Sequence, residues 1–448
     1  MATHPRWGEH FPDAQYVATV VDSFPRVDRH RQVESSISNK YTTDVLPLNL
    51  PPTGGKLTDP YLEFRIPTSP DLTDISNLAI ELSLSITKED GITPVEETDH
   101  VMFANGIANT VFRAVQIFLG GTTVENQPYH AIKSYIKLLT SMSPSKAKSL
   151  ARLGFFHEEG LFSGKKKLCQ DNHFQEANAR EKAILTEVRE KGLHVTFPLL
   201  VDVSSCESYL PSNLDMTIRL ELADRKFVLQ SPKTDAKFQY QINSAKLWVT
   251  RVQPHSTALI ALEKTFLAKG FLDILFAKTL YKSYILGRNQ SHIVMENVWG
   301  EVLPEKIYMV MIDLQSFQGE WKKNPLYFQH LDVSDISIMV NGSAAYNIKA
   351  EFPHRFSQLY YTTLASLGLE NDGLIKYEDF TEGRTVSVFS FVPEQLNDTV
   401  PLQRDANLRI EVSLRQADSS NNIILLFGET HGIIRINYDR SVQVDVRA

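Results

Sequence analysis

Two stretches of the sequence decide the fold: Asn213-Leu-Asp-Met-Thr-Ile-Arg-Leu-Glu-Leu222 and Asn407-Leu-Arg-Ile-Glu-Val-Ser-Leu414. In both stretches apolar and polar residues alternate, which is typical of a β-strand with one face in a core. The offset between the two asparagines, in residue numbers, is 407 − 213 = 194. Phe197 and Phe391, each in an earlier apolar strand, have the same offset. The sequence therefore contains one β-rich pattern twice, and a duplicated β-domain is the simplest explanation.

A second pair of alternating strands lies between these late strands and the start of each half. Val115–Leu119 leads into Gly120-Gly121, and Ile336–Val340 leads into Asn341-Gly342. Gly and Asn adopt the positive φ angles that a tight hairpin turn requires, so each pair of residues predicts a hairpin. The offset between the two turns is 342 − 121 = 221. Between the turn and the late strand, the first half is therefore longer than the second by 221 − 194 = 27 positions.

A helix is predicted after each turn. Tyr129, Ile132, Tyr135, Ile136 and Leu139 recur at helical spacing in the first half, and Phe356, Leu359, Tyr360, Thr363 and Leu364 do so in the second. Strand, tight turn, helix and late strand therefore follow in the same order in both halves. The order of the elements, and not only the composition, is duplicated.

The two halves meet around Gln253–Lys269. Ser256 is the expected N-cap of a helix that continues through Phe266 and ends at Gly270. Strands are then predicted over Tyr281–Leu286, His292–Val298 and Ile307–Leu314. We expect three parts: an N-terminal arm at residues 1–40, a first domain at 41–253 and a second domain at 254–448.

The first domain contains a long polar segment, Ser141–Gly192, that has no counterpart in the second. It includes Lys165-Lys166-Lys167 and a strongly helical tract, Glu176–Glu190. Because charged side chains are rarely buried, we expect this segment to be an insertion exposed at one end of the first domain.

Composition limits the classes of function. A hydrophobic content of 42% with 22% charged residues is typical of a globular chain. The net charge of −7 provides no overall attraction to nucleic acid, so no sequence-specific nucleic-acid partner is expected. The most apolar stretch, Gly270–Leu286, is interrupted by three charged residues, and Met1–Pro12 lacks the apolar core of a secretory signal. With only two cysteines, no disulfide framework is expected, and the chain fits a reducing compartment.

Motifs that suggest enzymatic or metal chemistry are weak. Gly54-Gly-Lys-Leu-Thr58 lacks the spacing of a phosphate-binding loop, and His157-Glu158-Glu159 lacks the second histidine of a zinc-binding helix. Cys169 has no CxxC partner, and Glu370 and Asp372 are more typical of a solvated turn than of a glycosidase carboxylate pair. We therefore predict no catalytic, cofactor-binding or metal-binding residue, and each of the scattered histidines is expected to be hydrogen-bonded or at the surface.

Three sequons for N-glycosylation start at Asn289, Asn341 and Asn397. Without a secretory signal they are expected to remain unmodified, and Asn341 already has a role in a predicted turn.

The order of segments resembles the hexon-like, double jelly-roll major capsid proteins of adintoviruses and Maverick/Polinton elements. The segments that carry the resemblance are Asp74–Leu78, Val111–Leu119, Ile307–Asp313, Phe317-Gln-Gly319, Lys323–Phe328, Ile336–Gly342, Tyr377–Phe380, Phe389–Pro393, Asn407–Val412 and Ile434–Arg440. The resemblance extends from about Thr42 to the C-terminus and is strongest in the second half. The N-terminal arm and the Ser141–Gly192 segment depart from it.

The resemblance implies an all-β fold of two tandem eight-stranded antiparallel jelly-roll sandwiches with short helices in loops. It also implies a non-enzymatic structural protein of an icosahedral DNA virus or virus-like element. Such a chain would form homotrimeric capsomers located in the virion, with neighbouring capsomers, penton and minor capsid proteins as partners. No cofactor is implied.

Two other classes remain open at this point. Tandem β-sandwiches also occur in proteins that bind or cleave glycans, although the four Trp residues here are spread along the chain rather than clustered. The other class is a host scaffold or chaperone, for which the sequence has no positive feature.

Overall fold

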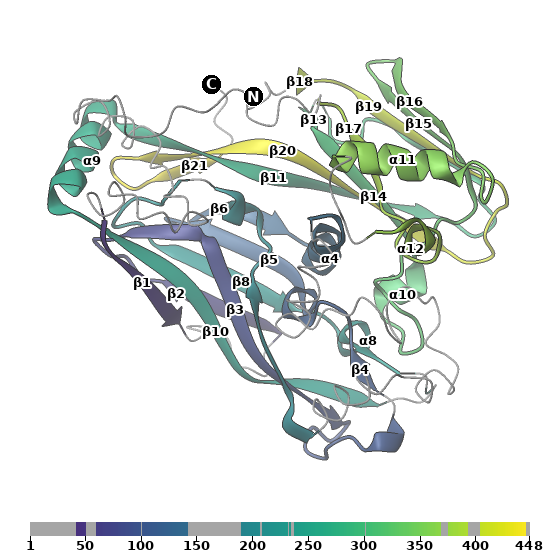
Figure 1. The fold of residues 1–448 in the computed structure, drawn as a ribbon, viewed down its shortest axis with the longest axis horizontal. Helices are drawn as coiled ribbons and strands as arrows, with labels where there is room; N and C mark the ends of the chain where they lie inside the picture. The colour runs from purple at the N-terminus through teal and green to yellow at the C-terminus, as the bar shows by residue number, and fades with distance from the viewer. Residues whose placement is uncertain are drawn as a thin grey trace.

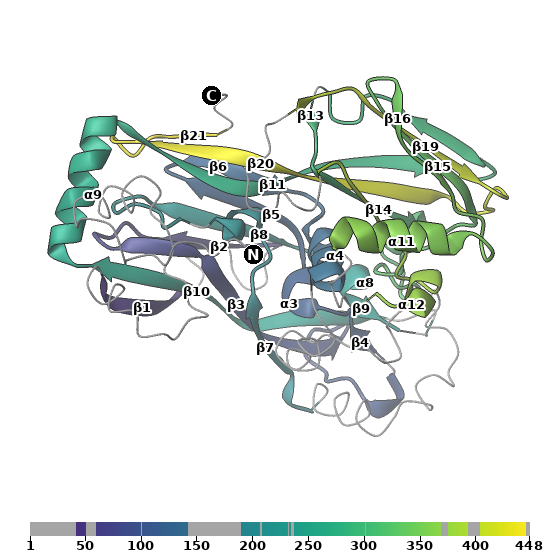
Figure 2. The same ribbon diagram turned by 45° about the horizontal axis from the view of Figure 1, so that its top comes forward.

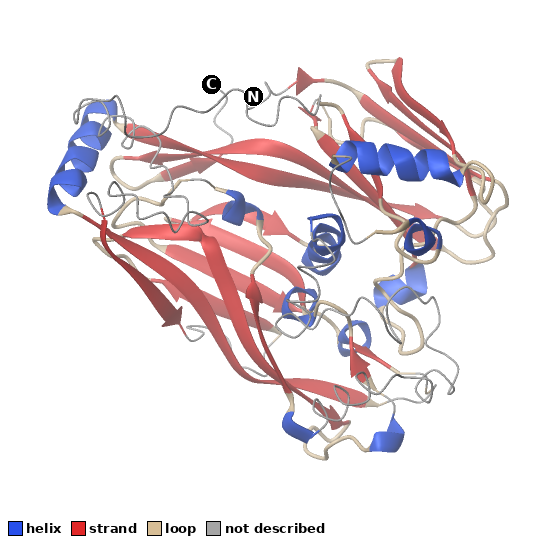
Figure 3. Cartoon of the chain, in the orientation of Figure 1, coloured by secondary structure: helices blue, strands red, loops and turns tan. Residues whose placement is uncertain are grey.

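The computed structural model describes residues 42–50, 60–99, 101–141, 190–206, 208–231, 233, 237–300, 302–368, 375–392 and 404–444. Within these residues the chain is mostly antiparallel β-sheet, with helices in the connections between strands (Figure 3). Residues 1–40 and nearly all of the Ser141–Gly192 segment lie outside the described residues.

Two four-stranded sheets form the first roll, with the strand orders β1-β10-β3-β7 and β2-β8-β5-β6. Its strands are β1 (Thr42–Leu50), β2 (Tyr61–Ile66), β3 (Leu72–Lys88), β5 (Phe112–Leu119), β6 (Thr122–Gln127), β7 (Leu193–Pro198), β8 (Met216–Leu222) and β10 (Phe238–Pro254). In chain order, β1, β3, β7 and β10 belong to one sheet, and β2, β5, β6 and β8 belong to the other. This exchange between two facing sheets is the strand order of a jelly roll.

The second roll repeats this arrangement with the orders β11-β20-β14-β17 and β12-β19-β15-β16, and β21 is added beside β20. Its strands are β11 (Phe271–Leu286), β12 (His292–Met295), β14 (Lys306–Asp313), β15 (Val333–Val340), β16 (Ser343–Lys349), β17 (Ser387–Ser390), β19 (Leu408–Leu414), β20 (Asn422–Asn437) and β21 (Val442–Val444). Every strand of the first roll has an equivalent at the same place in the second. The predicted fold of two eight-stranded jelly-roll sandwiches is confirmed.

Short elements occupy the connections. Two small sheets pair β4 (Met102–Phe103) with β9 (Leu229–Gln230) and β13 (Val302–Leu303) with β18 (Arg404–Asp405). The helices are α3 (Ile107–Thr110), α4 (His130–Ser141), α8 (Arg225–Val228), α9 (Ser256–Lys269), α10 (Leu314–Gln318), α11 (Phe356–Leu367) and α12 (Tyr377–Thr381), with 3-10 turns η1 (Glu97–Asp99) and η2 (Asp202–Ser205). The two predicted helices after the turns are confirmed as α4 and α11, which occupy equivalent connections.

The hairpin register corrects the offset between the late strands. The backbone N–H of Gly120 donates to the carbonyl of Asp215, and in the second roll the N–H of Asn341 donates to the carbonyl of Asn407. The offset between Gly120 and Asn341 is 341 − 120 = 221, the offset of the two turns, so these residues are equivalent. Their hydrogen-bond partners Asp215 and Asn407 are therefore also equivalent, at an offset of 407 − 215 = 192. The late-strand offset of 194 was therefore too large by two. An even shift leaves every side chain on the same face, so the alternation alone did not reveal the error.

The late strands lie in the centre of their sheets, as the alternation predicts. Ile218 lies between Phe64 of β2 and Ile117 of β5, and all three side chains are 0% exposed. Its equivalent at the corrected offset is Ile410, and the neighbouring Val412 is also 0% exposed. Both strands therefore direct their apolar residues into a sandwich interior, where burying each such side chain stabilises the fold by about 1.5–3 kcal/mol.

Several predicted boundaries differ from the structure. The N-cap of α9 is His255 and not Ser256, because Nδ1 of His255 accepts a hydrogen bond from the N–H of Thr257. Gly270 ends this helix with a φ of 81°, as expected. β11 already begins at Phe271 rather than near Tyr281, β12 ends at Met295, β14 ends at Asp313, and Phe391 lies just beyond β17.

Candidate functional site

The candidate functional site is the junction where the two rolls meet, and α4 lies at its centre. In Figures 1 and 2, α4 is located between the strands of the first roll and those of the second, and α11 lies beside the strands of the second roll. Ten of the 12 residues of α4 are buried, including Lys133. Only four of the 12 residues of α11 are buried. α4, which the sequence predicts to bury one face, is therefore covered on nearly all sides, whereas α11 is not.

Lys133 forms a buried ionic network at this junction. Its Nζ donates to the carboxylate of Asp202 in η2 and lies 3.7 Å from Oε1 of Glu125 in β6. Burial opposes the charged form of Lys133, but Asp202 and Glu125 raise its pKa above the ordinary value. Burial and the negative charge of Asp202 raise the pKa of Glu125, whereas Lys133 lowers it. The lysine therefore stays charged between two carboxyl groups.

Backbone hydrogen bonds fix the carboxyl group of Glu125 in this network. Glu125 accepts from the N–H of Asp202, at 2.8 Å to Oε2, and from the N–H of Val203 at 3.1 Å. A carboxyl group that accepts N–H donors in this way costs less free energy to bury. The turn that contains Asp202 is thus held against strand β6.

Residues of η2 also cap the free edge of β11, the first strand of the second roll. The backbone N–H of Ala277 donates to Oγ of Ser205 at 2.7 Å, and the N–H of Thr279 donates to Oδ2 of Asp202 at 2.9 Å. Oγ1 of Thr279 also donates to Oδ1 of Asp202. β11 pairs with β20 on its other side, so these side chains supply acceptors where a neighbouring strand would otherwise lie.

Aromatic contacts extend the junction on both sides of this network. Tyr129, just before α4, packs edge-on against Tyr281 of β11 at 5.7 Å between ring centroids, and its hydroxyl donates to Oγ of Ser283. Further along α4, the ring of Tyr135 lies 5.8 Å from that of Phe328 in the second roll. These contacts bury apolar surface from both rolls in one continuous core.

The loop after α10 makes a second connection to the first roll. The N–H of Ser231 donates to the carbonyl of Trp321 at 2.9 Å, and the indole packs edge-on against Phe238 of β10. Nε2 of Gln230 donates to Oδ1 of Asn324 at 3.0 Å, and both residues are buried. This connection holds the two rolls together through residues that are far from Lys133 in the sequence.

The C-terminal strand β21 makes a third connection, to the β5–β6 hairpin of the first roll. Oγ1 of Thr122 donates to the carbonyl of Val442 at 3.1 Å. At Gly120 a Cβ atom would lie 3.0 Å from the carbonyl oxygen of Arg440, so only glycine fits without displacement. The equivalent residue in the second roll, Asn341, has nearly the same φ, 52° against 53°, and the side chain is tolerated there. The contact with Arg440 at the junction, and not the geometry of the turn, therefore requires glycine at position 120.

His130 and Gln127 carry unpaired polar atoms beside the network. Both residues are buried, and both ring nitrogens of His130 and Nε2 of Gln127 have no hydrogen-bond partner among the described residues. Burial lowers the pKa of His130 to about 3, and the positive charges of Lys133 and Lys137 act in the same direction. The imidazole is therefore held in its neutral form.

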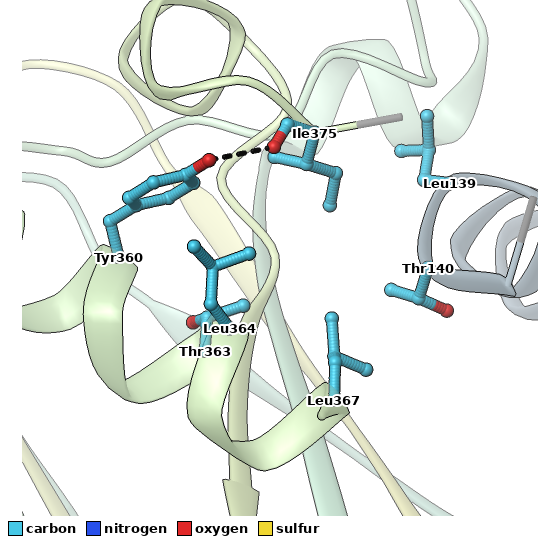
Figure 4. Close-up of a pocket in the computed structure, with 7 residues that line it drawn as sticks. All are labelled: Leu139, Thr140, Tyr360, Thr363, Leu364, Leu367 and Ile375. Carbon is cyan, nitrogen blue, oxygen red and sulfur yellow. Dashed lines mark hydrogen bonds between the residues drawn. The ribbon is translucent and has the colours of Figure 1, made fainter. Parts of the chain in front are cut away.

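A small apolar pocket lies where α4 and α11 approach each other (Figure 4). Leu139 and Thr140 of α4 face Leu364 and Leu367 of α11, and the hydroxyl of Tyr360 donates to the carbonyl of Ile375. Its volume of about 10 Å³ is room for roughly one water molecule, so it is not a site for an organic ligand.

The motifs considered in the sequence do not form a site in the described part of the chain. Gly54–Thr58, His157–Glu159, Cys169, Glu370, Asp372 and Asn397 all lie outside it. Cys206 is buried, and Asn289 and Asn341 are turn residues with φ values of 63° and 52°. Within the described residues no group of three or more His, Cys, Asp or Glu side chains could hold a metal ion. Over the same residues no helix has the length and hydrophobicity to cross a membrane.

The sequence prediction missed the junction and misjudged one histidine. His130 is neither hydrogen-bonded nor at the surface, which contradicts the expectation for the histidines. One signal was available: Lys133 lies directly after Ile132, on the apolar face that Tyr129 and Ile136 predict. A lysine on such a face requires a buried carboxylate partner, but the sequence does not show that the partner is Asp202, 69 residues away.

Comparison with solved structures identifies the class of fold. No protein-family model matches the sequence, and no curated protein matches it. A chain of the Sputnik virophage, from a cryo-EM structure, superimposes with a TM-score of 0.59 at 13% identity, over 91% of this chain and 90% of that one. The mavirus major capsid protein gives 0.51 at 12% identity, over 94% and 92%. The Faustovirus major capsid protein gives 0.56 at 10% identity, over 87% and 90%. The chain therefore has a double jelly-roll fold, and it shares that fold with these viral proteins over almost its whole length.

Proposed function

We propose that this chain is the major capsid protein of an icosahedral DNA virus or virus-like element. The observation that carries the proposal is the extent of the structural match: both rolls and their connections superimpose together on the mavirus major capsid protein, over more than nine-tenths of each chain. A match to one roll would be far less specific, because single jelly rolls occur in many unrelated proteins.

The junction between the rolls supports a structural function. Three separate connections, through α4, Trp321 and β21, hold the two rolls as one unit. Three chains with two rolls each would give 3 × 2 = 6 similar units, so a homotrimer could occupy a hexagonal lattice position. Obligate interfaces of this kind bury several thousand Å² and need no catalytic site.

We also infer a non-enzymatic function, which the same comparison supports. The relatives by fold are capsid proteins, and no observation favours a glycan-binding or glycan-cleaving function. The pocket between α4 and α11 is too small for a sugar. We accordingly assign no catalytic residue and no cofactor.

The domain division, partners and location are part of this proposal. We place the first domain at residues 41–253 and the second at 254–448, with α9 as the connection, and we keep residues 1–40 as an arm. The Ser141–Gly192 segment is proposed to be exposed at one end of the first roll. Neighbouring capsomers, a penton protein and minor capsid proteins are the proposed partners, and the virion is the proposed location.

Mass measurement and electron microscopy of the purified chain would test the function. The expected particle has a hexagonal outline and contains three chains, so its mass is three times the 50.8 kDa of one chain. Limited proteolysis should cut first within Ser141–Gly192. A chain that stays monomeric at high concentration and forms no ordered particle would contradict the proposal.

A further inference from the structure

Helix α9, which connects the two rolls, exposes apolar side chains on the side away from its buried residues. The buried residues recur at helical spacing and are Ala258, Leu262 and Phe266. On the other side, Ile260 is 57% exposed and Leu267 is 60% exposed. Because an α-helix has about 3.6 residues per turn, two residues that are seven apart lie on the same side of it. Ile260 and Leu267 therefore form one exposed apolar stripe along α9.

The apolar surface continues at the C-terminal end of this helix. Tyr438, in the turn between β20 and β21, is 42% exposed, and its ring packs edge-on against Phe266 at 5.5 Å between centroids. Ile260, Leu267 and Tyr438 are three of the nine large apolar side chains that are exposed among the described residues. Single exposed apolar side chains are common, but several at one end of a molecule indicate a surface that binds another segment of chain.

The start of β1 places the N-terminal arm beside this stripe. In the antiparallel register of β1 with β10, Thr42 is opposite Pro254, the last residue of β10. The next residue, His255, is the N-cap of α9. β1 and α9 accordingly lie at the same end of the first roll (Figures 1 and 2). The arm therefore joins β1 next to the first turn of α9.

The last residues of the arm are long enough to extend along α9. From His255 to Leu267 the helix rises about 18 Å, at about 1.5 Å per residue. About six extended residues span this length, at about 3.3 Å per residue. Residues 33–40, Val-Glu-Ser-Ser-Ile-Ser-Asn-Lys, precede the described part of the chain and exceed that length.

The composition of this segment matches the stripe. It contains two apolar residues, Val33 and Ile37, and one acidic residue, Glu34. On α9 the exposed Lys264 lies within the stripe, four residues after Ile260. The two apolar residues of the arm can therefore cover the stripe while Glu34 provides the opposite charge to Lys264.

We propose that residues 33–40 bind the exposed stripe of α9 in the same chain, with Val33 and Ile37 against its apolar side chains. The arm then covers the helix that connects the two rolls. Because the segment is tethered at Thr42, its effective concentration at the stripe is in the millimolar range, and a small contact is sufficient to hold it. This contact lies within one chain, so it does not depend on the proposed homotrimer.

Hydrogen exchange of the full chain, measured by mass spectrometry, tests whether the arm is bound. Ile260→Asp places a charge in the stripe. Ile92→Asp is the matched control, because Ile92 is 83% exposed in the loop after β3, whose last residue, Lys88, pairs with the opposite end of β10 from α9. Both side chains are exposed, so both variants should retain the wild-type fold, which thermal unfolding checks.

In the wild type we expect the amides of residues 33–40 to exchange more slowly than those of an unstructured peptide. Ile260→Asp should raise their exchange rate by on the order of tenfold or more, and Leu267→Asp should have the same effect. Ile92→Asp should leave the rate unchanged. Exchange at the unstructured rate in the wild type, or slow exchange that persists in both α9 variants, would overturn the proposed contact.

A photo-crosslinking amino acid at position 267 identifies the segment that covers the stripe. With isotopically light and heavy chains mixed before assembly, we expect crosslinks to peptides within residues 33–40 of the same isotopic form only. Light-to-heavy crosslinks would show that a second copy binds the stripe, and crosslinks to another segment would place that segment there, so either result contradicts the proposed contact. The capsomer proposal is tested separately by the mass of the particle and stands whichever of these results is obtained.

Discussion

Asp202 of the first roll holds Thr279 of the second by two hydrogen bonds. Its carboxylate accepts from the backbone N–H of Thr279 at 2.9 Å and from the Thr279 hydroxyl at 2.8 Å. The same carboxylate accepts from Lys133 on α4. One side chain therefore connects a helix of the first roll, a turn of the first roll and the edge strand of the second.

Replacing Lys133 by Met should destabilise the protein strongly. Removal of the ammonium group leaves Asp202 and Glu125 buried without their countercharge, and breaking a buried ion pair typically costs about 3–5 kcal/mol. Lys137→Met is the control, because the side chain lies one turn later on α4 and burial lowers its pKa. This control should be nearly neutral. Denaturant unfolding compares the two, and equal losses would show that the Lys133 network does not stabilise the junction.

Gly120→Ala should cost more than Gly121→Ala. Both residues have positive φ, 53° and 79°, so both substitutions carry backbone strain of about 1–2 kcal/mol. Only at Gly120 would the new Cβ also meet the carbonyl oxygen of Arg440, since nothing lies within 4 Å at Gly121. The difference between the two melting temperatures therefore measures the close approach of β21. Identical melting temperatures would contradict that approach.

Ile218→Asp and Val412→Asp should both abolish soluble trimer. Each side chain is 0% exposed, and an unpaired buried charge costs several kcal/mol against a domain stability of about 5–15 kcal/mol. Arg219→Asp and Arg409→Asp, on the opposite strand faces, should be milder, because both arginines are partly exposed in ion pairs. Soluble yield and gel filtration distinguish these outcomes. If Ile218→Asp is harmless, Ile218 does not face the sandwich interior, and the same result for Val412→Asp would exclude Val412 from it.

His130 should make the protein less stable as the pH falls below about 6.5. Its folded-state pKa of about 3 lies below the ordinary value of 6.5, so in that range the unfolded chain takes up a proton that the folded chain does not. The free energy of unfolding then falls by up to about 1.4 kcal/mol per pH unit from this residue.

Urea unfolding of the wild type and of His130→Leu between pH 7 and pH 4.5 isolates this contribution. The variant should lose less stability than the wild type as the pH falls, and the difference between them should grow with decreasing pH. His130→Gln, which also cannot titrate, should behave as the Leu variant does. Parallel curves for wild type and variants would exclude the histidine as the cause.

The strand pattern made most of the fold predictable. The alternation in β8 and β19 and the turn residues Gly120-Gly121 and Asn341-Gly342 are local features, and they were sufficient to predict strands, hairpins and their duplication. The late-strand offset was wrong because a shift of two residues preserves the alternation. Only the hydrogen bonds between Gly120 and Asp215 and between Asn341 and Asn407 define the register.

The junction was not predictable because its partners are distant in the sequence. Asp202 and Thr279 are 77 residues apart, and Thr122 and Val442 are 320 residues apart. Nothing in the local pattern of Thr279 distinguishes it from any other strand threonine. The N-cap at His255 was missed for a related reason, since an imidazole nitrogen substitutes there for the serine hydroxyl that capping preferences favour.

The contact of β21 with the β5–β6 hairpin sets an order of events during synthesis. Thr122 leaves the ribosome 320 residues before Val442, the residue that covers its turn. At about 5–20 residues per second, the hairpin waits on the order of half a minute for its covering strand. A nascent chain can therefore complete the sheets of its first roll, but the contact between β21 and the β5–β6 hairpin cannot form until residue 442 has emerged. Translation products interrupted before residue 442 would therefore lack this contact and leave the β5–β6 turn without its covering strand.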